Sequence, residues 1–267
     1  MSYKILFIGE IVGKYGVYAA RKGVKELKKS HNINFVIANA NGATGGFGLG
    51  RNHAVTLKNS GIDILTGGDY IFFKRDLVDN LPKISYILRP SNYTPQTPGK
   101  GWTKVKSEGK NIAIINILGP SGINRNHPSN PFTYIENLID RVKEDADIVL
   151  ICFHSKTTAE KQLMYHIIDG KCDALIGSGS KSITADYHIS NKKMAYITDI
   201  GRTGSSDMPG GLESQVEIEK LITCIPKRSK EINSNLELQG TIVTFDENNI
   251  VSDIEIVRLP VKKEEDD

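Results

Sequence analysis

Sulfur-containing residues and tryptophan are scarce in this chain of 267 residues, which has three cysteines, four methionines and one tryptophan. Cys152, Cys172 and Cys224 match neither a paired disulfide framework nor a metal-binding spacing, so we expect a reducing compartment, the cytoplasm. No apolar run approaches the roughly 20 residues of a membrane-spanning helix, so we predict no membrane partner. The 34 basic residues only slightly exceed the 31 acidic ones, which does not predict a nucleic-acid polymer as a partner.

Short apolar runs alternate with stretches of helical period along most of the chain. The apolar runs predict strands at residues 4–9, 34–39, 62–68, 111–118, 146–153, 172–178 and 194–200. The stretches between them predict helices near residues 17–30, 52–60, 131–143 and 157–169. Continuous apolar strands with helices between them are typical of sheets buried on both faces. The pattern therefore predicts a layered α/β fold in which much of the sheet is parallel.

The end of the chain has a different pattern. From residue 235, polar and apolar residues alternate around a DENN turn, which predicts a C-terminal β-hairpin. No internal repeat or low-complexity linker divides the sequence, so we expect one domain over residues 1–260 and a charged tail at 261–267. Segments 90–101 and 119–131 are rich in glycine, proline and asparagine and predict long surface loops.

Polar residues gather directly after the predicted strands. In sheets of this class, ligands bind outside the carboxyl ends of the strands. A single polar residue at such a place is more often a helix cap or a turn former, but several in order favour a shared site. We therefore expect a site built from these positions: Glu10, Asn39, Asn41, Asp69, His154, Ser178 to Lys181, and Asp199.

The stretch LIGSGSKS at residues 175–182 follows one of these strands. Its glycines let backbone N–H groups approach an anion, and its lysine supplies positive charge, as in a phosphate-binding loop. Short clusters of glycine and serine are more often plain turns. The residues of this stretch alone leave both interpretations open.

Eight short segments, in order along the chain, carry a resemblance to a known family. They read GEIVG (9–13), ANGATG (40–45), GGDY (67–70), RPSNY (89–93), TPGKG (97–101), FHSKTTAEK (153–161), TAD (184–186) and YITDIGRTG (196–204). On these segments the chain resembles the YmdB-like family of calcineurin-type metallophosphoesterases. The resemblance implies an αββα sandwich with mixed sheets, a centre of two divalent metal ions and phosphodiesterase activity on cyclic nucleotides.

The positions to which the resemblance assigns metal binding have changed in this sequence. Glu10 stands where the family has aspartate, Ala40 stands where it has the glutamate that bridges the two ions, and Asn41 keeps the neighbouring asparagine. Asp69 replaces a ligand asparagine, and Cys152 replaces an aspartate. Without the bridging carboxylate, no shared anion offsets the repulsion between two nearby dications, which disfavours a binuclear centre.

The remaining positions of the implied site have changed too, with one exception. His154 matches a family ligand, but Lys156 replaces a glutamate two residues later. Tyr70 replaces the histidine that assists the leaving group, and a phenol with an ordinary pKa of about 10 is a poor general acid at neutral pH. Gly179 and Lys181 occupy the positions of two metal-binding histidines. LIGSGSKS therefore resembles a metal site that has lost its ligands.

Our first hypothesis is a pseudoenzyme, with a metallophosphoesterase fold but without a working two-metal centre or a bound cofactor. It would still bind a phosphate or nucleotide ligand, aided by the backbone N–H groups of the turn at 178–182. The side chains that we expect to bind this ligand are Asn41, His154, Ser178, Ser180 and Lys181. A simpler alternative is that Lys181 pairs with Glu10 or Asp69 and only replaces the charge of an ion.

A second hypothesis is a phosphodiesterase that acts with one divalent ion, Mn, Fe, Zn or Mg. Lys181 would replace the charge of the second ion and stabilise a phosphoryl transition state, and Tyr70 would be the second catalytic candidate. The candidate ligands of the single ion are Glu10, Asn41, Asp69 and His154.

A third hypothesis is a structural or regulatory homo-oligomer whose subunits meet at the loops 90–101 and 119–131. Aromatic residues are common interface anchors, although they are as often part of the local core. Four aromatic residues lie in or beside these loops: Tyr93, Trp102, Phe132 and Tyr134.

Overall fold

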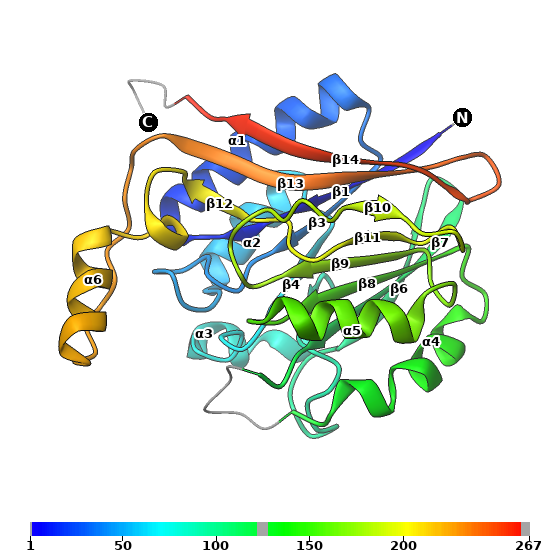
Figure 1. Ribbon diagram of the computed structural model, residues 1–267, viewed down its shortest axis with the longest axis horizontal. Coiled ribbons are helices and arrows are strands. Elements are labelled where there is room, and N and C mark those ends of the chain that lie inside the picture. Colours follow the sequence, from blue (N-terminus) through cyan, green and yellow to red (C-terminus); the bar gives the residue numbers. More distant parts are fainter. Residues whose placement is uncertain (1, 122–127, 263–267) are drawn as a thin grey trace.

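Two mixed β-sheets stack face to face in the computed structural model, which describes residues 2–121 and 128–262 (Figure 1). The first sheet has the strand order β2-β12-β13-β1-β3-β4-β5, and β14 pairs with β13. Its strands are β1 (Tyr3–Ile8), β2 (Glu10–Ile11), β3 (Phe35–Asn39), β4 (Ile64–Thr66), β5 (Ile87–Leu88), β12 (Arg202–Ser205), β13 (Leu236–Phe245) and β14 (Val251–Pro260). β1 runs parallel to β3 and antiparallel to β13, so the sheet is mixed.

The second sheet has the strand order β10-β11-β9-β8-β7-β6. Its strands are β6 (Trp102–Ser107), β7 (Lys110–Leu118), β8 (Ile148–His154), β9 (Ala174–Ser178), β10 (His188–Ile189) and β11 (Ala195–Ile197). The four inner strands are parallel, and the two edge strands, β6 and β10, are antiparallel to their neighbours. The carboxyl ends of β7, β8 and β9 therefore lie at one edge of the sheet.

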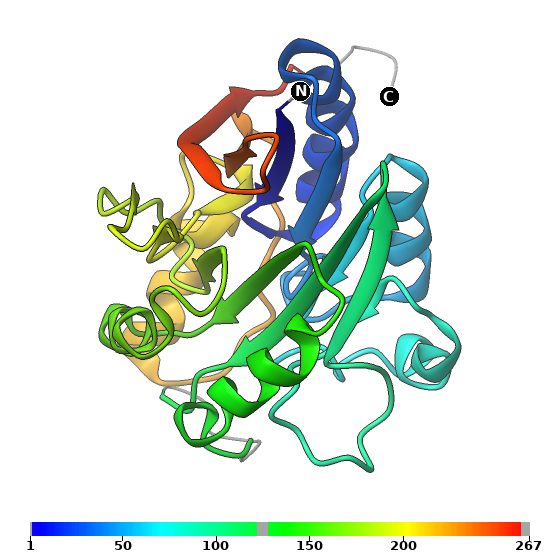
Figure 2. The same cartoon turned by 90° about the vertical axis from the view of Figure 1, so that its right-hand side faces the viewer.

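Helices cover the two outer faces of the stacked sheets (Figure 2). α1 (Gly13–His31) and α2 (Arg51–Asn59) lie on the first sheet, and α4 (Ile135–Lys143) and α5 (Thr158–Ile168) lie on the second. α3 (Arg75–Val78) is a single turn, and α6 (Ser214–Thr223) lies at one end of the molecule (Figure 1). Over the described residues, no helix has both the length and the hydrophobicity to cross a bilayer.

Alternating side chains along the central strands fill three apolar layers. On β1, Leu6 and Ile8 pack towards α1 and α2, while Ile5 and Phe7 face the second sheet. On β8, Ile151 packs towards α4 and α5. Successive residues of a strand point to opposite faces, so each strand contributes to two of the layers. Three apolar layers separate four layers of secondary structure, which makes the fold an αββα sandwich.

The predicted layered α/β fold, with its mixed sheets and C-terminal hairpin, is confirmed. Sequence patterning missed the short strands β2, β5, β10 and β12, because two to four residues are too few to show a period. It also missed β6 and α6. Residues 263–267 of the predicted tail and residues 122–127 of the loop 119–131 lie outside the described part of the chain.

The aromatic residues in and beside the two long loops are half-buried and pack against their own chain. Trp102, Phe132 and Tyr134 lie against the apolar layer beneath α4 and α5. Tyr93 contacts Phe72, with ring centroids 5.3 Å apart. A run of exposed apolar side chains occurs instead on and after α6, at Ile218, Leu221, Ile222 and Ile225. Homo-oligomerisation stays a prediction, and α6 is the more exposed apolar surface for it.

Candidate functional site

The carboxyl ends of β3, β4, β8 and β9 meet between the two sheets. Asn39 ends β3, His154 ends β8 and Ser178 ends β9, while Asp69 follows β4 by three residues. Asn39 Nδ2 donates to Ser178 Oγ at 2.7 Å, and Asn41 Nδ2 donates to Asp69 Oδ1 at 2.9 Å. The structure therefore brings together side chains from four strand ends, as expected where parallel strands share a direction.

His154 lies at the centre of this group with 1% of its surface exposed. Asn39 Nδ2 donates to His154 Nδ1 at 3.1 Å, which leaves the ring proton on Nε2, 3.3 Å from Asp69 Oδ1. A Cβ atom at residue 68 would lie 2.4 Å from the ring, so Gly68 is needed for this close approach. Protein groups therefore contact both ring nitrogens.

Asn41 presents its nitrogen, and not its oxygen, to the site. Its Oδ1 accepts hydrogen bonds from the backbone N–H groups of Gly68 and Tyr70 at 2.8 and 2.9 Å. Two backbone donors fix the orientation of the amide, because a flipped amide would place N–H groups against N–H groups. Amide oxygens bind hard cations and amide nitrogens do not. In this geometry Asn41 is a hydrogen-bond donor to Asp69.

Asp69 is a buried carboxylate that three neighbours keep ionised. Lys156 Nζ lies 3.5 Å from its Oδ2, and His154 and Asn41 contact its Oδ1. Burial alone would raise the pKa of Asp69, but the hydrogen bonds and charges of these neighbours outweigh it and lower the pKa well below the ordinary value. Sequence reasoning assigned no partner to Lys156.

Glu10 lies at the other side of the site and is fully buried. Lys181 Nζ is 3.3 Å from Glu10 Oε1, so the pairing expected from the sequence as the simpler alternative is confirmed. The ammonium group is within ion-pair distance but is not aligned as a hydrogen bond. Among the described residues, neither oxygen of Glu10 has a hydrogen-bond donor. The ammonium group of Lys181 therefore balances the charge of Glu10, but the carboxylate oxygens accept no hydrogen bond from the described residues.

Tyr70 belongs to an aromatic cluster beside Lys156. Its ring meets Phe47 and Phe73 edge to face, with centroids 5.2 and 4.9 Å apart. Lys156 Nζ lies 5.0 Å from the centroid of Tyr70, within the range of a cation–π contact. The ring thus helps to hold the lysine that neutralises Asp69.

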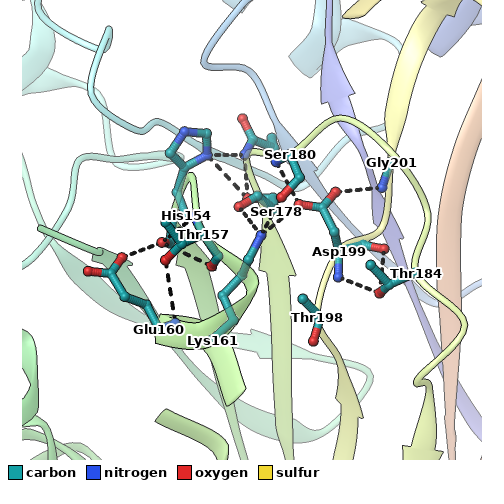
Figure 3. A network of polar contacts seen from close by, with 12 residues as sticks. His154, Thr157, Glu160, Lys161, Ser178, Ser180, Thr184, Thr198, Asp199 and Gly201 are labelled. Carbon is teal, nitrogen blue, oxygen red and sulfur yellow. Dashed lines mark hydrogen bonds and ion pairs between the residues drawn. The ribbon is translucent and has the colours of Figure 1, made fainter. Parts of the chain in front are cut away.

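A second lysine network fixes the turn that follows β9 (Figure 3). Lys161 Nζ donates to Asp199 Oδ2 at 2.8 Å, to Ser180 Oγ at 3.0 Å and to the carbonyl of Ser178 at 3.2 Å. The side chains of Lys161 and Asp199 are 1% and 0% exposed. Asp199 also accepts from the backbone N–H of Gly201 at 2.9 Å. All three donor positions of the ammonium group are used.

The turn at residues 178–181 is shaped by these internal contacts. The backbone N–H of Ser180 donates to Asp199 Oδ2 at 2.7 Å, so this predicted anion-binding group is already engaged. Gly179 has φ +112°, and a Cβ atom there would lie 2.5 Å from the carbonyl oxygen of Ser155. No side chain fits at residue 179 in this conformation. Lys181 is the one side chain of the turn that reaches Glu10.

Cys152, which the sequence resemblance aligned with an aspartate, is a core residue in this structure. Its side chain packs between the two sheets. Burial raises the pKa of the thiol to about 12, so the thiol is neutral at physiological pH. The side chain therefore contributes apolar packing beneath the site.

Two buried residues of the site escaped sequence reasoning. Lys161 lies on the same helical face as Met164 and Ile168, so a lysine on an apolar stripe was the available signal. Asn116 interrupts the apolar run of β7, and its Nδ2 donates to the carbonyls of Gly67 and Leu88 at 2.7 and 2.9 Å. This amide ties the second sheet to the strand ends of the first.

The residues of the site do not fit a centre of two metal ions. Ala40 and Gly179 supply no ligand, and the oxygen of Asn41 is turned towards the backbone. Asp69 and Glu10 already have protein cations, Lys156 and Lys181, within ion-pair distance. Within residues 2–121 and 128–262, no group of three or more His, Cys, Asp or Glu side chains is arranged to hold a metal ion.

Comparison with known proteins identifies the family of this chain. The model of the YmdB-like protein family matches residues 6–257. The chain belongs to the YmdB-like family. A YmdB-like relative named as a 2',3'-cyclic-nucleotide 2'-phosphodiesterase in Bacillus subtilis is 33% identical over 245 residues, which cover 91% of this chain and 92% of the relative. The resemblance drawn from the sequence is thereby confirmed.

Two solved structures share this fold over nearly their whole length. A phosphatase of Mycoplasma pneumoniae superposes with a TM-score of 0.91 at 27% identity, covering 97% of this chain and 94% of the other. A Thermus thermophilus protein titled as hypothetical superposes with a TM-score of 0.87 at 26% identity, covering 96% of this chain and 100% of the other. The αββα sandwich of this chain is therefore the phosphoesterase fold.

Replacing Lys161 with methionine should strongly destabilise the protein. The change leaves the carboxylate of Asp199 buried without a counter-ion, and we expect a loss of about 3–5 kcal/mol in the free energy of unfolding, measured by urea denaturation. Lys192→Met is the matched control, because the Lys192 side chain is 65% exposed and lies 3.9 Å from Asp169. It should cost less than about 0.5 kcal/mol. Equal losses of unfolding free energy in the two variants would contradict the stabilising role of the buried Lys161–Asp199 pair.

The stability that Asp69 provides should depend on pH. A carboxyl group with a lowered folded-state pKa stabilises the protein above its ordinary pKa, near 3.9, and this contribution is lost as the pH falls towards the folded-state value. We expect Asp69→Asn to be about 1–3 kcal/mol less stable than the unmodified protein at pH 7, with the difference shrinking towards pH 3. Urea denaturation at both pH values measures it. A difference independent of pH would refute the role of the ionised carboxylate.

Proposed function

We propose that this YmdB-like protein binds a phosphate-bearing ligand at the candidate site without hydrolysing it, and that Lys156 and Lys181 take the place of the two metal ions. The observation that carries the proposal is the pair of ion pairs, with Lys181 3.3 Å from Glu10 and Lys156 3.5 Å from Asp69. Each lysine neutralises one buried carboxylate that a cation would otherwise need to neutralise.

The chemistry of an ammonium group supports binding and not hydrolysis. A metal ion accepts electron pairs and generates hydroxide from water at neutral pH, whereas an ammonium group supplies only charge and hydrogen-bond donors. His154 Nε2 faces Asp69, and the amide of Asn41 also contacts Asp69. Glu10, the carboxylate whose oxygens receive no hydrogen bond from the described residues, is fully buried behind Lys181. The site therefore has the means to hold an anion and lacks the means to activate a nucleophile.

The accessibility of the two lysines gives a ligand a route of approach. The side chains of Lys156 and Lys181 are 26% and 18% exposed, while those of Asp69 and Glu10 are 8% and 0% exposed. A phosphate arriving from solvent meets the ammonium groups before the carboxylates. The predicted contacts of Ser178 and Ser180 are weaker support, since Asn39 donates to the hydroxyl of Ser178 and Asp199 takes the N–H of Ser180.

A second candidate is a phosphodiesterase that works with one divalent ion. It is favoured by the two oxygens of Glu10, which are buried and receive no hydrogen bond from the described residues. The relative named as a 2',3'-cyclic-nucleotide 2'-phosphodiesterase supplies the substrate class for this candidate. Lys181 would have to leave Glu10 for an ion to bind there.

The proposal predicts no stoichiometric metal and no turnover. Elemental analysis of the purified protein should find less than about 0.1 ion per chain, and 2',3'-cyclic AMP and a generic phosphodiester should be hydrolysed at the blank rate with added Mn, Fe, Zn or Mg. Metal at one ion per chain, with activity that His154→Ala abolishes, would establish the second candidate instead.

Removing the two lysines should create affinity for a cation. In the double variant Lys156→Met and Lys181→Met, Glu10 and Asp69 lose their counter-ions, so 1 mM Mn²⁺ should raise the melting temperature of the variant by several degrees but not that of the unmodified protein. Lys192→Met is the control and should respond like the unmodified protein. Equal shifts in all three proteins would show that the lysines do not substitute for ions.

A further inference from the structure

A pocket of about 660 Å³ lies where the end of β5, the edge strand β6 and the helix α4 meet. It is formed largely by the segments RPSNY and TPGKG, which the sequence singles out and which the proposed function does not use. None of the candidate-site residues lines it. The residues that matter for its chemistry are Arg89, Tyr93, Lys100, Trp102, Lys104 and Arg141.

Arg89 is a buried cation that has no acidic partner among residues 2–121 and 128–262. Only 7% of its surface is exposed. Its Nη1 donates to the carbonyl of Pro90 at 2.7 Å, while its Nε is buried and finds no acceptor among the described residues. A guanidinium group does not lose its proton at physiological pH, so burial without an anion is costly. The wall of the pocket therefore carries a positive charge that an anion from outside would stabilise.

The other charges of the pocket have the same sign. Lys100, Lys104 and Arg141 also line it, and no carboxylate does so within the described part of the chain. Another hollow, beside the start of β13, is different, because there Arg258 donates to Glu237 at 2.9 Å and the two charges cancel. The cations of the Arg89 pocket are not cancelled in this way. The net positive charge of the pocket favours an anion that carries more than one negative charge.

The pocket also offers aromatic surface. Trp102 and Tyr93 line it, and the guanidinium of Arg141 lies 5.9 Å from the centroid of the Trp102 ring. Tyr134 hydrogen-bonds Ser91 at 2.9 Å, and burial raises the pKa of Tyr134 to about 12, so its phenol adds no negative charge. Aromatic and arginine faces are the groups on which nucleobases stack. The volume lies within the range of about 300–1,000 Å³ of small-molecule sites.

We propose that this pocket is a second ligand site that binds a nucleoside phosphate, with the phosphate at Arg89 and Lys100 and the base against Trp102. This site is independent of the candidate site and of whether that site hydrolyses anything. A phosphate carries about 1.5 to 2 negative charges at neutral pH and several acceptor oxygens, which match a buried guanidinium whose Nε has no acceptor among the described residues.

Isothermal titration calorimetry with AMP, and with adenosine as the uncharged probe, tests the proposal. We expect AMP to bind and adenosine to bind at least 10-fold more weakly. Arg89→Met should weaken AMP binding at this site at least 10-fold. Lys181→Met should remove only binding at the candidate site and should leave the component of AMP binding that Arg89→Met weakens, so failure here and failure at the candidate site are distinguishable. Lys25→Ala, an exposed lysine of α1 in another basic hollow, is the control.

Because Arg89 is buried and its replacement can also affect folding, Lys100→Ala at an exposed lysine and Trp102→Ala at a half-buried ring provide a second test. Each should weaken AMP binding, Lys100→Ala with a reduced dependence on salt and Trp102→Ala with an unchanged one. Absence of AMP binding to the unmodified protein, equal binding of adenosine, or unchanged affinity in both variants would overturn the proposal.

Discussion

Burial of negative charge at the strand ends is the constraint on which this rim of the sandwich depends. Three carboxylates with at most 8% of their side chains exposed lie there, and each lies within 3.5 Å of a lysine nitrogen. The pairs are Glu10 with Lys181, Asp69 with Lys156, and Asp199 with Lys161. A buried carboxylate without a partner costs several kcal/mol, so each position requires a cation of some kind. In this chain the protein itself supplies all three.

The three lysines differ in exposure: the side chain of Lys161 is 1% exposed, and those of Lys181 and Lys156 are 18% and 26% exposed. The Lys161 pair is closed to solvent and fixes the turn that carries Lys181. Solvent therefore reaches the side chains of Lys156 and Lys181, although each is paired with a carboxylate. A scaffold of the phosphoesterase type thus has a rim at which each of these three carboxylates is paired with a lysine. The buried Lys161 therefore helps to position Lys181.

Much of the fold and part of the site could be predicted from the sequence. The apolar runs located β1, β3, β7, β8 and β9, because buried parallel strands are continuous in their hydrophobicity. Strand ends located Glu10, Asn39, Asp69 and His154, because ligand-facing residues follow strands. β6 was missed because its residues WTKVKS are mostly polar or charged, as in an edge strand.

Pairing between distant residues could not be predicted in the same way. Lys156 and Asp69 are 87 positions apart, and their contact depends on the stacking of two sheets, which no local pattern encodes. The orientation of the Asn41 amide depends on two backbone donors that only the folded loop at 67–70 places. The sequence predicted that Lys181 pairs with either Glu10 or Asp69. Only the folded structure shows that its partner is Glu10.

The most direct test of the account is a crystal structure of the protein grown with Mn²⁺ and measured for anomalous scattering. The account predicts no anomalous peak between Glu10, Asp69 and His154, with the Nζ atoms of Lys181 and Lys156 in contact with the carboxylates. A manganese peak bound to Glu10 and His154, with Lys181 turned out to solvent, would contradict the claim that lysines have replaced the ions.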